Sequence, residues 1–297
     1  MAYKSGFITI IGRPNVGKST LLNLLTGEKI AIISKKPQTT RHNIRTILTT
    51  DNYQMIFVDT PGIHNPRNKL GEFMMKEAFT AFEGVDVIIF MVDAREKTIG
   101  PGDSKIIEEA LSKVSAPVIL VINKVDLVPK ESLLPLIAEY SKAYNFAEVV
   151  PISALDGSYR DKILSIIEKY LPEGEKFYPE DMLTDQTEKV LAQELIREKL
   201  LHLLEDEVPH GIGVEVVRFR EDENRKIIDI DANIYCEKES HKGIVIGKGG
   251  AMLKKVGTLA RQDMERLFGS KVNLKLWVKV KDDWRNSEFM LRELGYK

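Results

Sequence analysis

Short apolar runs alternate with segments of helical spacing through the first part of the chain. The runs typical of buried strands cover residues 7–11, 85–92, 117–123 and 148–153, with an apolar-rich hairpin at 45–50 and 53–58. Apolar residues recur every three or four positions at 19–25, 104–114 and 159–171. Because strands alternate with helices, the pattern predicts an α/β fold with a doubly wound, mostly parallel sheet.

The pattern changes after residue 172. Residues 172–179 are rich in proline and charge, which is typical of a linker. Beyond them the pattern predicts a helix from 185–188 to about 208, strands at 213–220 and 226–237 around a charged turn at 221–224, a helix through Leu267, a strand at 272–280 and a tail helix within 283–297. We therefore expect a first domain at 1–172, a linker at 173–180 and a smaller α+β domain at 181–297.

Length and composition narrow the class of protein. A chain of 297 residues is long enough for two domains that each bury a core. The net charge of −1 means that any nucleic-acid surface must be a local patch. The single cysteine, Cys236, excludes an internal disulfide and is expected to be a core or half-buried thiol. No long uncharged apolar run occurs, so we expect a cytosolic protein without a signal peptide or membrane span.

The segment GRPNVGKST lies between the first strand and the first helix and fits G-x-x-x-x-G-K-[ST]. Glycines let successive backbone N–H groups point at phosphate oxygens, and the helix N-terminus adds a partial positive charge. We expect Lys18 to reach the β- and γ-phosphates and Ser19 to bind Mg²⁺. An accidental glycine-rich turn is the alternative, which the strand and helix on either side disfavour. The predicted phosphate-binding residues are Gly12, Arg13, Pro14, Asn15, Val16, Gly17, Lys18, Ser19, Thr20 and Gly62.

Two later polar segments are expected beside this loop. In the stretch KKPQTTRHN, Thr40, or failing it Thr39, is placed to offer a hydroxyl to Mg²⁺. In the stretch DTPG, Asp59 ends a strand and is placed to hold Mg²⁺ directly or through water. The predicted Mg²⁺ ligands are therefore Ser19, Thr40 and Asp59, and the second segment comprises Asp59, Thr60, Pro61, Gly62 and Ile63, with the Gly62 N–H facing the γ-phosphate.

The segment NKVD at the end of the 117–123 strand indicates which base is bound. A carboxylate at Asp126 can accept hydrogen bonds from the N1–H and the 2-amino group of guanine, and adenine offers neither donor there. This argues against the rival interpretation, a P-loop kinase or ATPase acting on a small molecule. Asn123 can tie this loop to the phosphate loop, and the Lys124 stem can lie over the base. The predicted guanine-binding residues are Asn123, Lys124, Asp126, Ser153, Ala154 and Leu155.

In the second domain, GKGG at residues 247–250 fits G-x-x-G ahead of a helix. Glycines without a Cβ let a nucleic-acid backbone approach closely, and Lys248 adds positive charge. Residues 238–281 carry eleven Lys/Arg against three Asp/Glu, a net charge of +8, whereas residues 181–237 carry seven against fifteen, a net charge of −8. A basic face for single-stranded RNA follows from this, with Ile244, Val245, Ile246 and Leu253 as its apolar floor. A merely solvated face and a protein-binding surface are the alternatives.

These motifs, in this order, resemble known families. GRPNVGKS, QTTR, DTPG, NKVD and SAL are similar to the signature segments of translation-factor-class GTPases, most closely ribosome-assembly GTPases of the Era type, over about the first 170 residues. The order helix, strand, strand, helix, G-x-x-G, helix, strand resembles a type II KH domain. The resemblance implies a GTPase that hydrolyses GTP to GDP and phosphate. Our own hypothesis is that GTP orders residues 35–43 and 63–69, that this frees or reorients the KH cleft across the linker, and that RNA binding speeds hydrolysis in return.

One departure concerns catalysis. Ras-type GTPases carry a glutamine directly after the glycine of the second polar segment, and this chain has Ile63, which can neither donate nor accept a hydrogen bond. We therefore expect slow intrinsic turnover that a partner or an ion stimulates. In some relatives the asparagine at the position of Asn15 helps to bind K⁺, and shaping of the loop is the alternative role for that residue. A GTP-binding RNA scaffold with little catalysis is the alternative function.

The resemblance extends over nearly the full chain and implies more than the residues alone do. It implies binding of the 3′ end of 16S rRNA and of the 30S subunit, assistance in small-subunit assembly and rRNA maturation, and a monomer. It also implies a cytoplasmic location, partly peripheral on the cytoplasmic face of the cell membrane. The implied RNA-binding residues are Lys242, Gly243, Ile244, Ile246, Gly247, Lys248, Gly249, Gly250 and Lys254.

Overall fold

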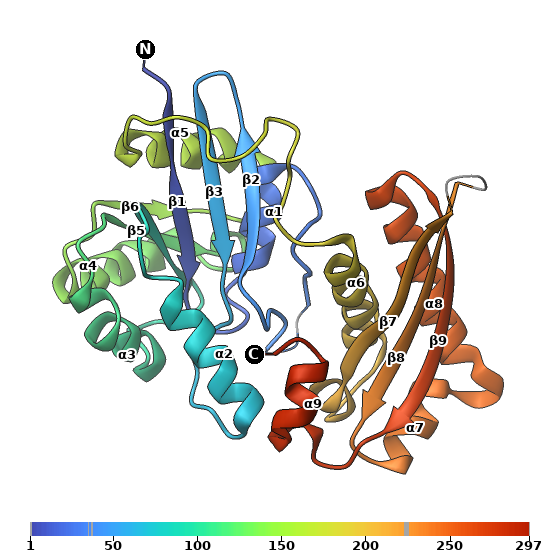
Figure 1. Ribbon diagram of the computed structural model, residues 1–297. Coiled ribbons are helices and arrows are strands. Elements are labelled where there is room, and N and C mark those ends of the chain that lie inside the picture. The colour runs from blue at the N-terminus through green and yellow to red at the C-terminus, as the bar shows by residue number, and fades with distance from the viewer. Residues whose placement is uncertain (1, 35, 37, 223–225, 297) are drawn as a thin grey trace. The chain divides into compact units, whose positions relative to one another are not determined.

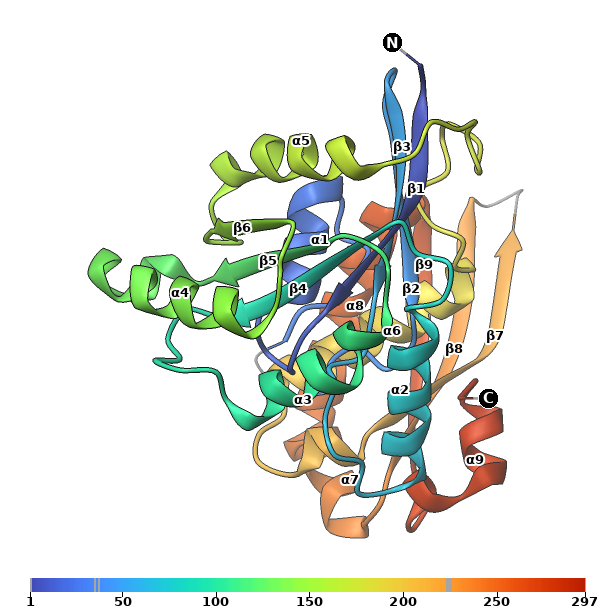
Figure 2. The same cartoon turned by 90° about the vertical axis from the view of Figure 1, so that its left-hand side faces the viewer.

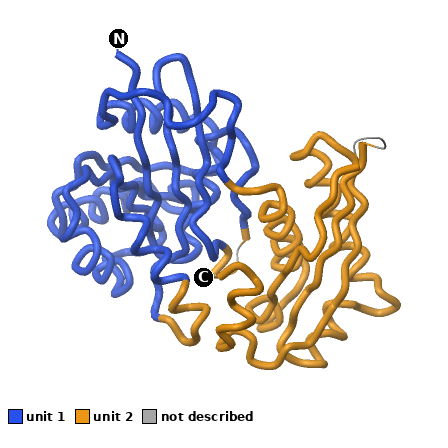
Figure 3. Tube along the Cα trace, in the orientation of Figure 1, with its two compact units in different colours: residues 1–33, 40–65, 74–185 blue, residues 34–39, 66–73, 186–297 orange. Residues whose placement is uncertain are grey.

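The computed structural model describes residues 2–34, 36, 38–222 and 226–296. Lys35 and Pro37 of the first polar stretch, and Glu223 and Asn224 of the expected turn, lie outside the described residues. The chain forms two compact units (Figure 3). Unit 1 comprises residues 1–33, 40–65 and 74–185, and unit 2 comprises residues 34–39, 66–73 and 186–297.

Unit 1 is built on a six-stranded sheet with the order β2-β3-β1-β4-β5-β6. The strands are β1 (Lys4–Ile11), β2 (Ile44–Thr49), β3 (Tyr53–Asp59), β4 (Val87–Asp93), β5 (Val118–Asn123) and β6 (Glu148–Pro151). Every neighbouring pair is parallel except β2 with β3, which form the expected hairpin. The predicted mostly parallel sheet is confirmed.

Helices cover both faces of this sheet, as Figures 1 and 2 show. Helices α1 (Lys18–Thr26) and α5 (Arg160–Tyr170) pack on one face, and α3 (Pro101–Glu109), α4 (Leu133–Ala143) and the C-terminal part of α2 (Lys69–Thr80) on the other. Strand β4 lies between them: Val87, Ile89 and Met91 contribute to the first core and Ile88, Phe90 and Val92 to the second. The central strands are continuous apolar runs because both faces of a doubly wound sheet are buried.

Three helices differ from expectation. The pattern left α2 and α4 unassigned, although Leu70, Met74 and Ala78 of α2 are buried at a spacing of four. The expected helix at 104–114 is wrong at both ends. It begins at Pro101, because the fixed φ of proline suits the first helical position, and ends at Glu109, before a separate 3₁₀ turn at Leu111–Lys113.

The segment predicted as a linker is held against the sheet of unit 1. The side chain of Gln54, which is fully buried, accepts hydrogen bonds from the backbone N–H of Phe177 (2.7 Å) and Tyr178 (3.0 Å) and donates to the carbonyl of Tyr178. Further along, the N–H of Ile47 donates to the carbonyl of Leu183 at 2.8 Å. The compact unit therefore extends to residue 185, beyond residues 173–180.

Unit 2 contains a three-stranded sheet with helices on one face (Figure 1). Strand β7 (Gly213–Asp222) is antiparallel to β8 (Ile227–Cys236), and β9 (Lys271–Val280) is parallel to β8. The helices are α6 (Glu188–Leu203), α7 (Glu239–Ile246), α8 (Ala251–Phe268) and the short α9 (Glu288–Glu293). Cys236 is fully buried among them, which confirms a core thiol.

The ends of α6 follow from local chemistry. The Thr187 hydroxyl caps the helix by accepting from the N–H of Val190, so the helix begins at Glu188, within the expected start at 185–188. The helix ends at Leu203, earlier than expected, and Val208–Gly211 forms a 3₁₀ turn of its own with Pro209 near its start. No helix in the described part of the chain is both long and apolar enough to cross a bilayer.

Two short segments from the first half of the sequence belong to unit 2. Arg197 of α6 is 1% exposed; its guanidinium donates to the carbonyl of Thr39 and pairs with Glu194. Lys69 pairs with Glu288 at 2.7 Å, and its backbone N–H donates to the Asn286 side chain at 3.2 Å. The chain thus passes from one compact unit to the other between residues 39 and 40.

Two tryptophans provide a matched test of the core of unit 2. Trp284 is fully buried and its indole N–H donates to the Gly211 carbonyl at 2.8 Å, whereas Trp277 on β9 is 45% exposed. Trp284→Ala should lower the free energy of unfolding by about 3–5 kcal/mol, because it leaves a cavity and an unpaired carbonyl. Trp277→Ala should cost less than about 1 kcal/mol. Urea unfolding of both variants measures this, and equal losses would contradict the packing described.

Candidate functional sites

The loop after β1 has the strained backbone that a phosphate-binding loop requires. Gly12 and Gly17 have φ angles of 148° and 107°, and Asn15 adopts a left-handed φ of 65°. A Cβ at Gly12 would lie 2.3 Å from the Met91 carbonyl oxygen, and one at Gly17 would lie 2.3 Å from the Asn123 amide nitrogen. Both glycines are therefore required by conformation and by space.

Lys18 is the first residue of α1, and its ammonium lies inside this loop. It is 7% exposed and donates to the carbonyls of Gly12 (3.2 Å) and Arg13 (3.0 Å). Burial lowers the pKa of Lys18 to about 8, against the opposing effect of the Asp59 carboxylate. The positive charge is thus held at the centre of a ring of backbone groups.

Three oxygen-bearing side chains meet at the start of α1. The Ser19 hydroxyl donates to the Asp59 carboxylate at 2.7 Å, the Thr40 hydroxyl donates to the same oxygen at 3.0 Å, and the two hydroxyls are 3.2 Å apart. The other carboxylate oxygen of Asp59 is buried without a hydrogen-bond partner. Burial raises the pKa of Asp59, against the effect of Lys18. Hard oxygens with one unsatisfied carboxylate oxygen fit a Mg²⁺ ion.

The two candidate threonines, Thr39 and Thr40, make different contacts. Thr40 is 6% exposed and joins Ser19 and Asp59, whereas the Thr39 hydroxyl donates to the carbonyl of Lys36 at 2.7 Å. Of the two alternatives that the sequence left open, Thr40 has the geometry of an ion ligand.

The second polar segment packs tightly against the phosphate loop. A Cβ at Gly62 would lie 2.7 Å from the backbone nitrogen of Pro14, so this close approach needs glycine. The Ile63 N–H donates to the Gly12 carbonyl at 3.3 Å, and its side chain is 6% exposed within the core. Thr60 is fully buried and donates to the carbonyl of Ile10. An apolar, buried Ile63 cannot orient a water molecule.

Asn123 at the end of β5 ties three loops together. Its amide nitrogen donates to the Val16 carbonyl at 2.7 Å, and its amide oxygen accepts from the Ala154 N–H at 2.8 Å. The predicted tie between Asn123 and the phosphate loop is confirmed. Ala154 is one of the predicted guanine-binding residues, but its N–H is donated to Asn123.

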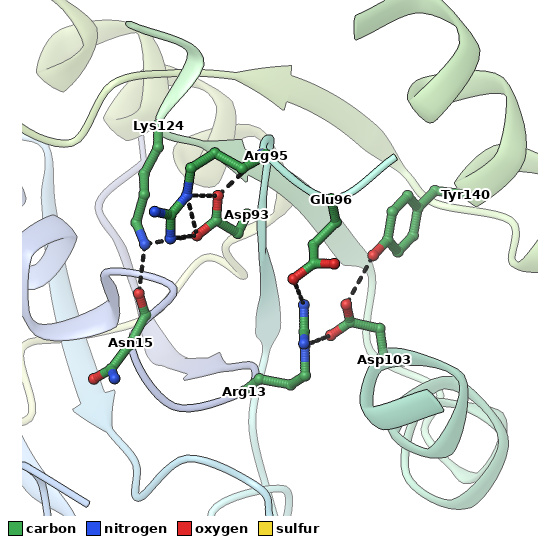
Figure 4. A network of polar contacts seen from close by, with 8 residues as sticks. All are labelled: Arg13, Asn15, Asp93, Arg95, Glu96, Asp103, Lys124 and Tyr140. Atoms are coloured by element: carbon green, nitrogen blue, oxygen red, sulfur yellow. Dashed lines mark hydrogen bonds and ion pairs between the residues drawn. The ribbon is translucent and has the colours of Figure 1, made fainter. Parts of the chain in front are cut away.

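Lys124 follows in a left-handed conformation with a φ of 68°. Its ammonium donates to the Asn15 carbonyl and to the Asp93 carboxylate, both at 2.6 Å (Figure 4). Asp126 lies in the 3₁₀ turn Val125–Leu127 and is exposed, as is Leu155 at 84%. The side chains of Asp126 and Leu155 therefore face solvent.

A network of charges surrounds the phosphate loop (Figure 4), and sequence reasoning missed its acids. Arg13 donates to Asp103 at 3.0 Å and to Glu96 at 3.1 Å, and fully buried Asp103 also accepts from Tyr140 at 2.9 Å. Asp93 was not singled out either, although it ends an apolar strand as Asp59 does. That shared position was the signal that could have found it.

The second site is a cleft of about 420 Å³ between α8 and β9. Its lining residues are Gly250, Leu253, Lys254, Gly257, Thr258, Arg261, Val272, Asn273, Leu274 and Leu276. Gly247, Gly249 and Gly250 have φ angles of 73°, 60° and 80°, which favour glycine. Nothing lies within 4 Å of where a Cβ of Gly249 or Gly250 would stand, so this loop surface is open.

The cleft confirms some expected lining residues and corrects others. Of the residues expected to form its apolar floor, Leu253 lines it, whereas Ile244, which is 49% exposed, and the partly buried Ile246 are not among its lining residues. The expectation for Val245 is wrong: it is fully buried in the core, because helical spacing turns it away from the exposed face of Ile244. The missed lining residues on α8 recur at helical spacing with Lys254, which was a usable signal.

Comparisons with known proteins agree with this geometry. A family model described as "50S ribosome-binding GTPase" matches residues 7–124, and a KH-domain model matches residues 207–285. GTPase Era of Clostridioides difficile is 55% identical, with 99% of each chain covered. GTPase Era of Ruminiclostridium cellulolyticum is 56% identical over 100% of this chain and 99% of its own.

The chain belongs to the Era family of GTPases.

Solved Era structures share the fold of the whole chain. An Era complex with MgGDPNP and nucleotides 1506–1542 of 16S ribosomal RNA matches with a TM-score of 0.95 at 43% identity over 99% of both chains. A variant of Aquifex aeolicus Era bound to GDP and AlF₄⁻ matches with a TM-score of 0.94, also at 43% identity and 99% coverage of both chains. The expected architecture, a P-loop GTPase sheet followed by a KH domain, is confirmed, and the protein is a GTPase.

Proposed function

We propose that this Era-family GTPase is a GTP-driven switch that binds the 3′ end of 16S rRNA and assists assembly of the small ribosomal subunit and rRNA maturation. The observation that carries the proposal is one chain with two sites: the Ser19, Thr40 and Asp59 cluster beside a phosphate loop, and a glycine-rich cleft in a KH fold. A relative that is 43% identical was solved with MgGDPNP and 16S rRNA nucleotides, which supports both halves.

The phosphates of GTP are assigned to residues 12–20 and to Gly62. The backbone N–H groups of the loop and the α1 N-terminus hold anionic oxygens, and Lys18 supplies a fixed positive charge. Ser19, Thr40 and Asp59 would hold Mg²⁺, whose chemistry is to neutralise charge between the β- and γ-phosphates. The chain's own groups orient the γ-phosphate for in-line attack by water.

We expect GTP hydrolysis to be slow without a stimulus, because Ile63 is buried where Ras-type GTPases place a polar glutamine. We assign stimulation to K⁺ near Asn15. This residue has a left-handed backbone, and its carbonyl is held by Lys124 at 2.6 Å, so its place in the loop is fixed. A monovalent cation there would add positive charge at the phosphates without an arginine.

The K⁺ assignment predicts a salt-specific rate. GTP hydrolysis should be about tenfold faster in KCl than in NaCl at equal ionic strength, because the proposed site would hold K⁺ in preference to the smaller Na⁺. Asn15→Ala should lose the difference between the two salts. Single-turnover hydrolysis measures both, with Arg95→Ala as a control outside the loop. Equal wild-type rates in the two salts would exclude the ion.

Guanine is assigned to the loops at the ends of β5 and β6. The Asp126 carboxylate would accept from the N1–H and the 2-amino group, and the Lys124 stem would lie over the base. Because the Ala154 N–H is donated to Asn123, we assign the exposed Leu155 N–H as the donor to guanine O6, with Ser153 shaping the turn. Asn123 contributes by holding these loops together.

Exchanging the acceptors of Asp126 should change the base that is bound. Asp126→Asn should weaken GDP binding by at least about thirtyfold, because charge-assisted hydrogen bonds are lost, and should improve binding of XDP, whose 2-oxo group the amide can meet. Asp161→Asn, which changes a carboxylate with 92% exposure in the same unit, is the control and should bind GDP normally. Fluorescence titration with GDP and XDP tests this, and unchanged preference would refute the assignment.

The RNA is assigned to the cleft of unit 2. A KH cleft holds about four unstacked nucleotides, with phosphates against the glycine-rich loop and base edges inside. We keep the residues expected from the resemblance and add Gly257, Thr258 and Arg261 of α8 with Asn273 of β9, which line the same cleft. Lys248, Lys254 and Arg261 supply the positive charge for phosphates.

Reversing charge in the glycine-rich loop should abolish RNA binding. Lys248→Asp combined with Gly249→Asp should weaken binding of an RNA with the 3′ end of 16S rRNA by at least about tenfold, because two negative charges would face phosphate. Lys255→Asp is the control, since Lys255 is exposed on α8 but does not line the cleft. GDP affinity should stay unchanged in both. RNA binding by the loop variant at wild-type strength would indicate a protein-binding surface instead.

We further propose that the nucleotide state controls RNA binding. Thr40 belongs to the ion-binding cluster, and the carbonyl of its neighbour Thr39 is held by Arg197 of the KH unit. Ordering of Thr40 by GTP would displace Thr39, which Arg197 holds. The segment 66–73 belongs to the same unit and is held through the Lys69–Glu288 pair, so a change in residues 63–65 would displace it likewise. A cytoplasmic monomer that is partly peripheral at the membrane is assigned from the family resemblance.

A further inference from the structure

Acidic residues at the end of β4 and beyond it hold the phosphate loop at two points (Figure 4). On one side Arg13 is held by Glu96 and Asp103. On the other side the carbonyl of Asn15 accepts from Lys124, whose ammonium also pairs with Asp93. The second contact joins the phosphate loop to the guanine loop through the Lys124 ammonium, which the Asp93 carboxylate holds.

The sheet fixes Asp93 beside the guanine loop. Asp93 ends β4 in register with Asn123 at the end of β5, and the N–H of Ala94 donates to the Asn123 carbonyl at 2.8 Å. Asp93 is 6% exposed. Burial acts to raise the pKa of Asp93, but hydrogen bonds from Arg95 and Lys124 outweigh it and bring the pKa to about 2. The carboxylate is therefore charged at neutral pH.

Lys124 needs a charged partner if its side chain is to keep one conformation. A lysine side chain is a flexible four-carbon stem that loses rotamer freedom when it is fixed. Two short charge-assisted hydrogen bonds, at 2.6 Å to Asn15 and 2.6 Å to Asp93, hold its end from two directions. The Lys124 stem is then held in one conformation between the guanine loop and the phosphate loop.

We propose that Asp93 is a positioning residue of the nucleotide site: it holds Lys124 so that the stem forms a fixed platform for guanine while the ammonium fixes the backbone of Asn15. The inference deepens the proposed function, since it rests on guanine binding at this site. Asp93 acts on the base and on the loop backbone, away from the γ-phosphate. It therefore favours GDP and GTP equally.

Arg95 provides the internal control. It pairs with Asp93 through three hydrogen bonds, the shortest 2.7 Å, but its own side chain is 57% exposed and belongs to the surface. If Asp93 served only to brace its own loop, Arg95 would be the partner that matters. If Asp93 acts through Lys124, removing Arg95 leaves the platform in place.

The test compares Asp93→Asn, Arg95→Ala and Lys124→Met. Asp93→Asn removes charge at nearly constant shape and should weaken GDP and a non-hydrolysable GTP analogue equally, by about tenfold. Its kcat at saturating GTP, measured in NaCl so that the proposed K⁺ site at Asn15 plays no part, should stay within about twofold of wild type. Arg95→Ala should change either affinity by less than about twofold. The double variant Asp93→Asn with Lys124→Met should bind no more weakly than Lys124→Met alone, because both act through one contact.

Three results would overturn the inference. They are normal GDP affinity in Asp93→Asn, an equal loss in Arg95→Ala, and additive losses in the double variant. Failure of the proposed function looks different, because the wild-type protein would then prefer no guanine nucleotide over its adenine counterpart. Thermal unfolding of each variant without nucleotide separates a folding defect from a binding defect.

Discussion

The amide of Asn123 is the contact on which the nucleotide site depends. One buried side chain donates to the phosphate loop at Val16 and accepts from the β6 loop at Ala154, while its own backbone begins the guanine loop. Parallel strands bring these loops to one edge of the sheet, and this amide ties all three of them together. Gly17 shows how tight the arrangement is, since a Cβ there would collide with Asn123. Asp93 and Lys124 extend the same design to Asn15.

Much of the fold and of the nucleotide site could be predicted, because the local pattern of apolar residues and motifs agrees with the structure. The strands of unit 1 are buried on both faces and so are apolar throughout, and the loops at their ends carry short motifs whose chemistry is specific. What the sequence hid depends on partners distant in the chain. The N–H of Ala154 is donated to Asn123, and Asp103 matters because Arg13 and Tyr140 flank it. Four of the ten residues that line the cleft of unit 2 come from β9. Helices α2 and α4 were missed although their buried positions recur every four residues.

The division of the chain gives the switch hypothesis its physical basis. Thr39 and Thr40 are adjacent in sequence, yet one is held by Arg197 of the KH unit and the other lies with Ser19 and Asp59. A segment that is covalently continuous cannot order one residue without restraining the next. Arg197 is buried with a charged partner, so loss of its contact with Thr39 would leave a polar group unsatisfied, which makes two discrete states more favourable than a gradual change.

The most direct test of the central claim is the affinity of the protein for an RNA with the 3′ end of 16S rRNA, measured by fluorescence anisotropy with Mg²⁺ and either GDP or a non-hydrolysable GTP analogue. Coupled sites predict tighter RNA binding with the analogue, by at least about fivefold, and a matching increase in affinity for the analogue when RNA is present. Equal RNA affinity in the two nucleotide states would contradict the account, because the two sites would then share a chain without sharing a switch.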